Sequence, residues 1–177
     1  MSVNFDTFPT FMASSSAFTP GATPQDVFAI TGNATTNVYV LKMGISTNQT
    51  TAGSNVWNIA KRSAANTGGT HAAPTAVPFN SNMAAASATL LQYTANPTAG
   101  TLIGNMWSGF VNAPAPATAG IGGYTGTEID FLANDTYGGP VALLTAAEVL
   151  SWNFGGAALP TGLSVLAWVM WAESPKV

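Results

Sequence analysis

Few side chains of this sequence could carry acid–base or nucleophilic chemistry. His71 is the only histidine, and no Gly-x-Ser-x-Gly motif presents a serine nucleophile, so a Ser-His-Asp triad is not expected. Glu128 and Asp130 are two residues apart on one face of an expected strand, and Asp135 follows closely. Such carboxylates could be the acid and base of a glycosidase, or calcium ligands. Their alternation with apolar residues is more typical of the solvated face of a strand, and we therefore expect no enzyme.

The chain also lacks two common features of metal and phosphate sites, cysteine ligands and a glycine-rich phosphate loop. It contains no cysteine, which excludes thiolate metal sites and disulfides. No Gly-x-x-x-x-Gly-Lys loop is present, and the paired glycines occur in stretches typical of turns. We accordingly expect no metal and no cofactor.

Tryptophan offers a different chemistry, because an exposed indole ring can stack on a sugar ring. Each tryptophan, however, lies within an apolar run with the composition of a strand, which favours packing in a core. A carbohydrate-binding platform is therefore the second interpretation. The tryptophans are Trp57, Trp107, Trp152, Trp168 and Trp171.

The composition of the chain restricts its partners. Only 6% of the 177 residues are charged, against roughly 25% in an ordinary soluble domain, and the net charge is −3. The four basic residues form no stripe that could neutralise phosphates, so we expect no direct nucleic-acid binding. No apolar run reaches the roughly 20 residues that span a bilayer, so we expect no membrane segment. Two interpretations stay open: a neutral secreted β protein, or a subunit with much of its surface in contacts.

The stretch Leu163–Glu173 is the strongest sign of assembly. Read with a period of two, one face carries Leu163, Val165, Ala167, Val169 and Trp171, and the opposite face carries Ser164, Leu166, Trp168, Met170 and Ala172, so both faces are largely apolar. A strand that is apolar on both faces needs cover on both. One face would meet the core of its own domain and the other a second subunit, so we expect Trp168 or Trp171 at a subunit contact.

The N-terminal residues 1–24 suggest an arm followed by a linker. Phe5, Phe8 and Phe11 are spaced by three, and the stretch 13–24 is rich in Ser, Pro, Thr and Ala. We expect the three phenylalanines to anchor an arm on a neighbouring subunit. The alternative is a first strand that pairs within its own sheet.

Residues 25–177 alternate short β-prone runs with turns. Eight or nine strands fit, with no room for crossover helices, so the sequence predicts a single all-β domain, an antiparallel sandwich. Long connections favour a jelly roll over an immunoglobulin-like topology. We expect a long irregular loop over Ala64–Ala86. Val141–Thr145 and Val149–Phe154 are expected to form a hairpin, with a short helix over Ala142–Leu150 as the alternative.

Four stretches resemble a family of tailed-phage virion proteins. They are Lys61-Arg-Ser-Ala-Ala-Asn-Thr-Gly-Gly-Thr70, Tyr93-Thr-Ala-Asn-Pro-Thr-Ala-Gly-Thr101, Ala113-Pro-Ala-Pro-Ala-Thr118 and the closing x-Trp-x-x-Trp-x-Glu of Ala167–Glu173. The resemblance spans roughly residues 36–173. The sequence departs from the family at Tyr137-Gly138-Gly139-Pro140, where an Arg-Pro-Gly element is expected.

The resemblance implies a jelly-roll capsid decoration or cement protein that binds the major capsid protein as homotrimers. Its place is then the exterior of the virion, after assembly in the host cytoplasm. A glycan-binding adhesin of a head fibre or tail is the alternative function. A small self-assembling capsid protein is less favoured, because residues 1–24 contain no Lys or Arg that could contact a genome.

Overall fold

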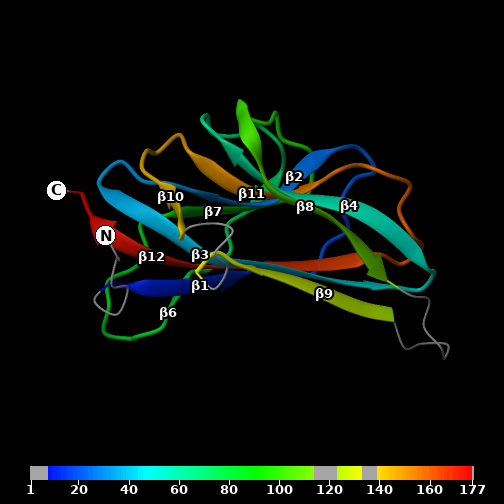
Figure 1. Ribbon diagram of the computed structural model, residues 1–177, viewed down its shortest axis with the longest axis horizontal. Helices are drawn as coiled ribbons and strands as arrows, with labels where there is room; N and C mark the ends of the chain where they lie inside the picture. Colours follow the sequence, from blue (N-terminus) through cyan, green and yellow to red (C-terminus); the bar gives the residue numbers. More distant parts are fainter. Residues whose placement is uncertain (1–7, 114–122, 133–138, 177) are drawn as a thin grey trace.

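The computed structural model describes residues 8–113, 123–132 and 139–176. Within these ranges the chain forms two six-stranded antiparallel sheets that face each other as a sandwich (Figure 1). The expected all-β antiparallel sandwich is thus confirmed. The jelly-roll topology stays a prediction.

We call the two layers sheet A and sheet B. Sheet A has the order β10-β3-β12-β1-β6, and β9 also pairs with β3. Its strands are β1 (Thr10–Ser14), β3 (Thr36–Gln49), β6 (Val77–Pro78), β9 (Gly123–Asp130), β10 (Val141–Leu143) and β12 (Ser164–Pro175). Sheet B has the order β5-β7-β2-β11-β4-β8. Its strands are β2 (Gln25–Thr31), β4 (Gly53–Arg62), β5 (His71–Ala72), β7 (Thr89–Tyr93), β8 (Leu102–Ala113) and β11 (Val149–Phe154).

The expected hairpin between residues 141 and 154 is wrong. β10 pairs with β3 in sheet A, whereas β11 lies between β2 and β4 in sheet B. The reason is burial, because Leu150, Trp152 and Phe154 are all fully buried and a central position gives β11 a partner on both sides. The alternative of a short helix over Ala142–Leu150 is also wrong, since the segment is strand and turn.

The expected N-terminal arm is corrected for residues 10–14, which form β1 within the chain's own sheet. β1 pairs with β12 from Thr10↔Ala172 to Ser14↔Trp168. Phe11 is only 2% exposed and stacks on Trp171, with ring centroids 5.5 Å apart. The boundary expected between residues 24 and 25 therefore does not separate an arm from the sandwich.

The beginning and the end of the described chain lie together. The N–H of Glu173 donates to the carbonyl oxygen of Pro9 at 3.0 Å, just before β1 begins. Because β1 and β12 are antiparallel neighbours, residues 9 and 173 are brought to the same end of the sandwich (Figure 1).

A buried ion pair fixes the middle of sheet B. Asp26 is fully buried, and Arg62 binds it with two hydrogen bonds of 2.7 Å, from Nε to Oδ2 and from Nη2 to Oδ1. Asn66 and Asn153 each donate a further bond of 2.8 Å to the same carboxylate. Arg62 Nη1 also donates to the carbonyl oxygen of Gly100 at 2.9 Å. The cluster thereby ties β2, β4 and β11 to the segments that follow β4 and precede β8.

The environment of Asp26 lowers the pKa of its carboxyl group. Burial by itself raises that pKa, but the hydrogen bonds from Arg62, Asn153 and Asn66 and the charge of Arg62 outweigh it, so the pKa lies below its ordinary value of 3.8. A group with a depressed pKa in the folded state binds fewer protons there than in the unfolded state. Its contribution to stability is therefore present above pH 3.8 and is lost as the pH falls through the folded value.

We predict that Asp26→Asn lowers the free energy of unfolding by about 3–5 kcal/mol at pH 7, because Arg62 is left buried without a counter-charge. On acidification the variant is also expected to lose less stability than the wild-type chain, because it has no carboxyl group at position 26. Guanidinium denaturation, followed by tryptophan fluorescence at neutral and acid pH, measures both effects. Asp130→Asn, at a carboxylate in a surface ion pair, is the control, and equal losses in the two variants would contradict the prediction.

Candidate interaction surface

Strand β12 has an inner and an outer row of apolar side chains, as its sequence predicts. On the inner side Val165, Ala167, Val169 and Trp171 are each 0% exposed. On the outer side Leu166 is 45% exposed, and Trp168 and Met170 are half-buried. The sequence did not decide which of the two tryptophans faces outward. The structure places Trp168 on the surface of sheet A and Trp171 in the core.

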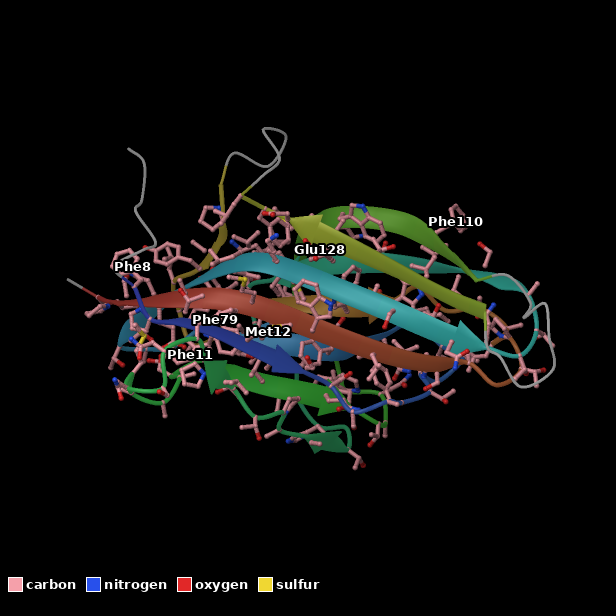
Figure 2. The ribbon with its side chains drawn as sticks, turned by 90° about the horizontal axis from the view of Figure 1, so that it is seen from below. Phe8, Phe11, Met12, Phe79, Phe110 and Glu128 are labelled. Atoms are coloured by element: carbon pink, nitrogen blue, oxygen red, sulfur yellow. The ribbon has the colours of Figure 1, made fainter. Side chains whose placement is uncertain are left out.

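Neighbouring strands extend the outer row of β12 into a wider apolar surface. Met12 of β1 is paired with Met170 on one side and with Val77 of β6 on the other. Val77 is 60% exposed and Phe79, which follows β6, is 63% exposed. We call Met12, Val77, Leu166, Trp168 and Met170 the apolar face. Figure 2 looks onto this side of the molecule, with β12 in red, β1 in blue, β3 in cyan and β9 in yellow-green.

A shallow groove borders the apolar face along β1. Its volume is about 570 Å³, and its lining is Met12, Ala13, Ser14, Thr75, Val77, Pro78 and Phe79. Figure 2 shows Met12 and Phe79 at this side of β1. The groove widens the apolar surface beyond the side chains of β12 itself.

Trp168 lies across the neighbouring strand β3, above Gly44. A Cβ atom at Gly44 would be 2.1 Å from Cε2 of Trp168, so a residue with a side chain would displace the indole ring. A second hollow of about 280 Å³ lies beside the ring, and it is lined by Trp168, Ile45, Ser46, Gly126, Thr127 and Glu128. The absence of a side chain at position 44 thus lets an aromatic ring lie over the sheet next to polar groups.

Charged residues stand at one border of the apolar face. Lys42 Nζ lies 2.6 Å from Oδ2 of Asp130 and 3.1 Å from Oε1 of Glu128. The hydrogen bonds to Asp130 and then to Glu128 raise the pKa of the Lys42 ammonium group. As expected, Ile129 and Phe131 point inward and are buried. The two carboxylates therefore share one ammonium group at the rim.

The structure places the other residues that the sequence singled out in different surroundings. Phe11 and Trp171 lie in the core, so neither is offered to a neighbouring subunit in this fold. Phe8 is half-buried, and Phe5 and Asp135 lie outside the residues that the structure describes. His71 is exposed, its ring edge-on to Tyr93 with centroids 5.8 Å apart. Trp57 and Trp152 are fully buried, and Trp107 packs against the edge of Trp152.

Within the described ranges, no three His, Asp or Glu side chains gather as a group that could hold a metal ion. Over the same ranges, no helix has the length and apolar character needed to cross a membrane.

The closing Trp-x-Glu of the sequence forms a buried polar junction. Glu173 is 6% exposed, and its Oε1 accepts a hydrogen bond of 2.9 Å from Nε1 of Trp171. The carboxylate also accepts the N–H of Ala88 at 2.9 Å, and both the N–H and the hydroxyl of Ser87, at 2.9 Å and 2.5 Å. Glu173 thus holds the segment before β7 against the inner side of β12.

Two parts of the exposed apolar surface were not anticipated from the sequence. Val77 and Phe79 fall in the stretch 64–86, where prolines and glycines indicate only an irregular loop. Phe110 and Ile103 of β8 are 69% and 59% exposed although they lie in an apolar strand. The signal that could have found Val77 and Phe79 is their position on either side of Pro78, because proline favours an edge strand.

We predict that Glu173→Gln lowers the free energy of unfolding by about 1–3 kcal/mol, because its amide NH₂ would face N–H donors that the carboxylate now satisfies. Chemical denaturation measures the loss. The same substitution at the exposed Glu128 is the matched control and should change stability by less than about 0.5 kcal/mol. Equal stability of the two variants would show that the junction contributes nothing.

The outer side of sheet A can bind a partner by burying apolar area, and a small number of polar groups lie beside that area. Trp168 and its hollow add one aromatic ring within reach of Ser46, Thr127 and Glu128. Comparisons of the chain with models of protein families, with curated proteins and with solved structures gave no match.

Proposed function

We propose that this chain is a structural, non-enzymatic virion protein: a capsid decoration or cement protein that binds a tailed-phage head shell as homotrimers. The observation that carries the proposal is the apolar face of sheet A, on which Val77 and Leu166 are exposed and the other three side chains are half-buried. The four sequence stretches that resemble phage virion proteins point to the same class. The partner is the major capsid protein, and the site of action is the exterior of the virion after assembly in the host cytoplasm.

The apolar face has the properties of a surface that is covered in use. Val77 and Leu166 of the apolar face are 60% and 45% exposed, and Phe79, two residues beyond Val77, is 63% exposed. Covering apolar area stabilises a contact by about 25 cal/mol per Å² removed from water. Contiguous exposed apolar side chains of this kind mark interaction sites on soluble proteins.

The low charge of the chain supports attachment over a large area. The sequence has only four basic and seven acidic residues, and Asp26, Arg62 and Glu173 are buried. Few charged groups must lose water when such a surface is covered. A closed trimer adds multivalency, because three copies of a weak contact hold a shell more strongly than one.

We predict that Leu166→Ser combined with Trp168→Ser abolishes binding to purified heads that lack the chain, while the fold is kept because both side chains face outward. Co-sedimentation with the heads measures binding, and circular dichroism measures the fold. Leu144→Ser, at a residue 48% exposed outside the apolar face, is the control and should bind like the wild type. Unchanged binding of the double variant would contradict the role of the face.

Imaging of virions tests the class of function itself. Virions made with the gene are expected to carry three copies around threefold positions of the shell, with sheet A turned toward the contacts. Virions made without it should lack this density and lose their contents at lower temperature. Identical images from the two preparations would overturn the proposal.

The hollow beside Trp168 favours one second candidate, a glycan-binding adhesin of a head fibre or tail. An aromatic ring next to Ser46, Thr127 and Glu128 provides both the stacking surface and the hydrogen-bonding groups that sugars need. The prediction of this candidate is binding on a glycan array that is lost in Trp168→Ser and kept in Leu144→Ser. An array without signal for the wild-type chain would exclude it.

A further inference from the structure

Strand β8 is an open edge of unusual length. It is the last strand of sheet B, pairs with β4 on one side, and spans the twelve residues Leu102–Ala113. In the part of the chain that the structure describes, no strand pairs with its other side. Alternate peptide groups of β8 therefore direct N–H and C=O groups outward, where only the backbone of another extended strand matches their spacing.

The side chains of β8 do not protect this edge. The strand contains no charged residue, and Leu102, Ile103 and Phe110 are 51%, 59% and 69% exposed. Proteins usually guard open edges with charges, with very short strands or with bulges. A long uncharged edge with exposed apolar side chains is the pattern that pairs with another chain.

The other edges of the sandwich are guarded. β5 and β6, at the ends of sheets B and A, are only two residues long, and β10, at the other end of sheet A, is three residues long. β9 is longer, but it carries Glu128 and Asp130, both bound to Lys42. Among the described edge strands, β8 alone combines length with the absence of charge, because the others are either very short or charged.

We infer that two copies of the chain pair through β8, antiparallel and around a twofold axis, so that sheet B continues from one copy into the other. A second copy fits this edge because a twofold contact sets each strand against itself, where any charge would meet the same charge. β8 has none. Since the described residues of each copy have one long unguarded edge, this contact by itself joins two copies and no more, and it is separate from the threefold contact of the proposed function.

The register of β8 places the contact in its second half. From Gly53↔Ala113 to Ile59↔Trp107 the strand pairs with β4 residue for residue. Before Trp107 the pairing shifts twice, and such bulges bend a strand out of the plane needed for a further partner. Trp107 packs inward on Trp152, so the alternation directs Ser108 and Phe110 to the outer face of sheet B, and both are exposed. Figure 2 shows Phe110 at the border of the molecule, away from the apolar face.

Cysteine cross-linking of the full chain tests the pairing, because the sequence has no cysteine of its own. Directly opposite residues of an antiparallel pair have Cβ atoms about 5 Å apart. Around a twofold axis a residue faces itself only on the axis, whereas Ser108 and Phe110 face each other when the axis passes Gly109. The double variant with Ser108→Cys and Phe110→Cys sets two cysteines opposite each other in each of these registers, and it is therefore expected to form a covalent dimer under mild oxidation. Leu144→Cys, equally a surface position, measures the yield from random collisions.

The edge itself is tested by adding charge. Phe110→Lys in the otherwise unchanged chain should reduce the fraction of dimer severalfold in analytical ultracentrifugation, because each copy would bring an unpaired charge into the contact. The Leu166→Ser and Trp168→Ser substitutions should leave the yield unchanged, which separates this contact from the one in the proposed function. The inference is overturned if the double cysteine variant on β8 does not exceed the yield of Leu144→Cys, or if Phe110→Lys has no effect on the fraction of dimer.

Discussion

The long antiparallel pairing of β12 with β3 is the interaction on which the rest of the sandwich depends. It runs from Ser164↔Asn48 to Pro175↔Thr36, with one irregularity between Met170 and Trp171. A strand in this central position offers one row of side chains to the core and one to the outside. Because both rows of β12 are apolar, the same element forms the core through Trp171 and the apolar face through Trp168. Folding and the proposed assembly thus depend on the same strand.

The sequence was informative where burial follows a local period. The alternation in Leu163–Trp171 predicted the two faces of β12, and the alternation around Ile129 predicted which side of β9 is buried. Which face lies inside depends on the partner sheet, so the choice between Trp168 and Trp171 could not be made locally. Phe11 shows the same limit, because its burial depends on a tryptophan 160 residues later in the chain.

Pairing partners were the least predictable part of the fold. Residues 141–154 have the composition of a hairpin, yet β10 and β11 belong to different sheets, since each finds more burial with a distant strand. The interaction surface was predictable only for β12. Val77, Phe79 and Phe110 become surface residues through the positions of β6 and β8 at sheet edges, which a local pattern does not specify.

Several of the few charged residues of this chain lie in its interior. Asp26 with Arg62, and Glu173 with Trp171 and Ser87, hold loops to strands in buried polar clusters. These clusters give directional contacts to a molecule whose core is otherwise apolar. They also remove charge from the exterior, so that the surface is closer to neutral than the composition indicates.

The hydrogen bond between Pro9 and Glu173 has a practical meaning for anyone who wishes to attach cargo to this molecule. Peptides or domains fused before β1 and after β12 would emerge next to each other, on the same tip, and would compete for room. A short peptide that joins the two termini would instead give a circular backbone. Opening this backbone at a different loop would place the new termini elsewhere.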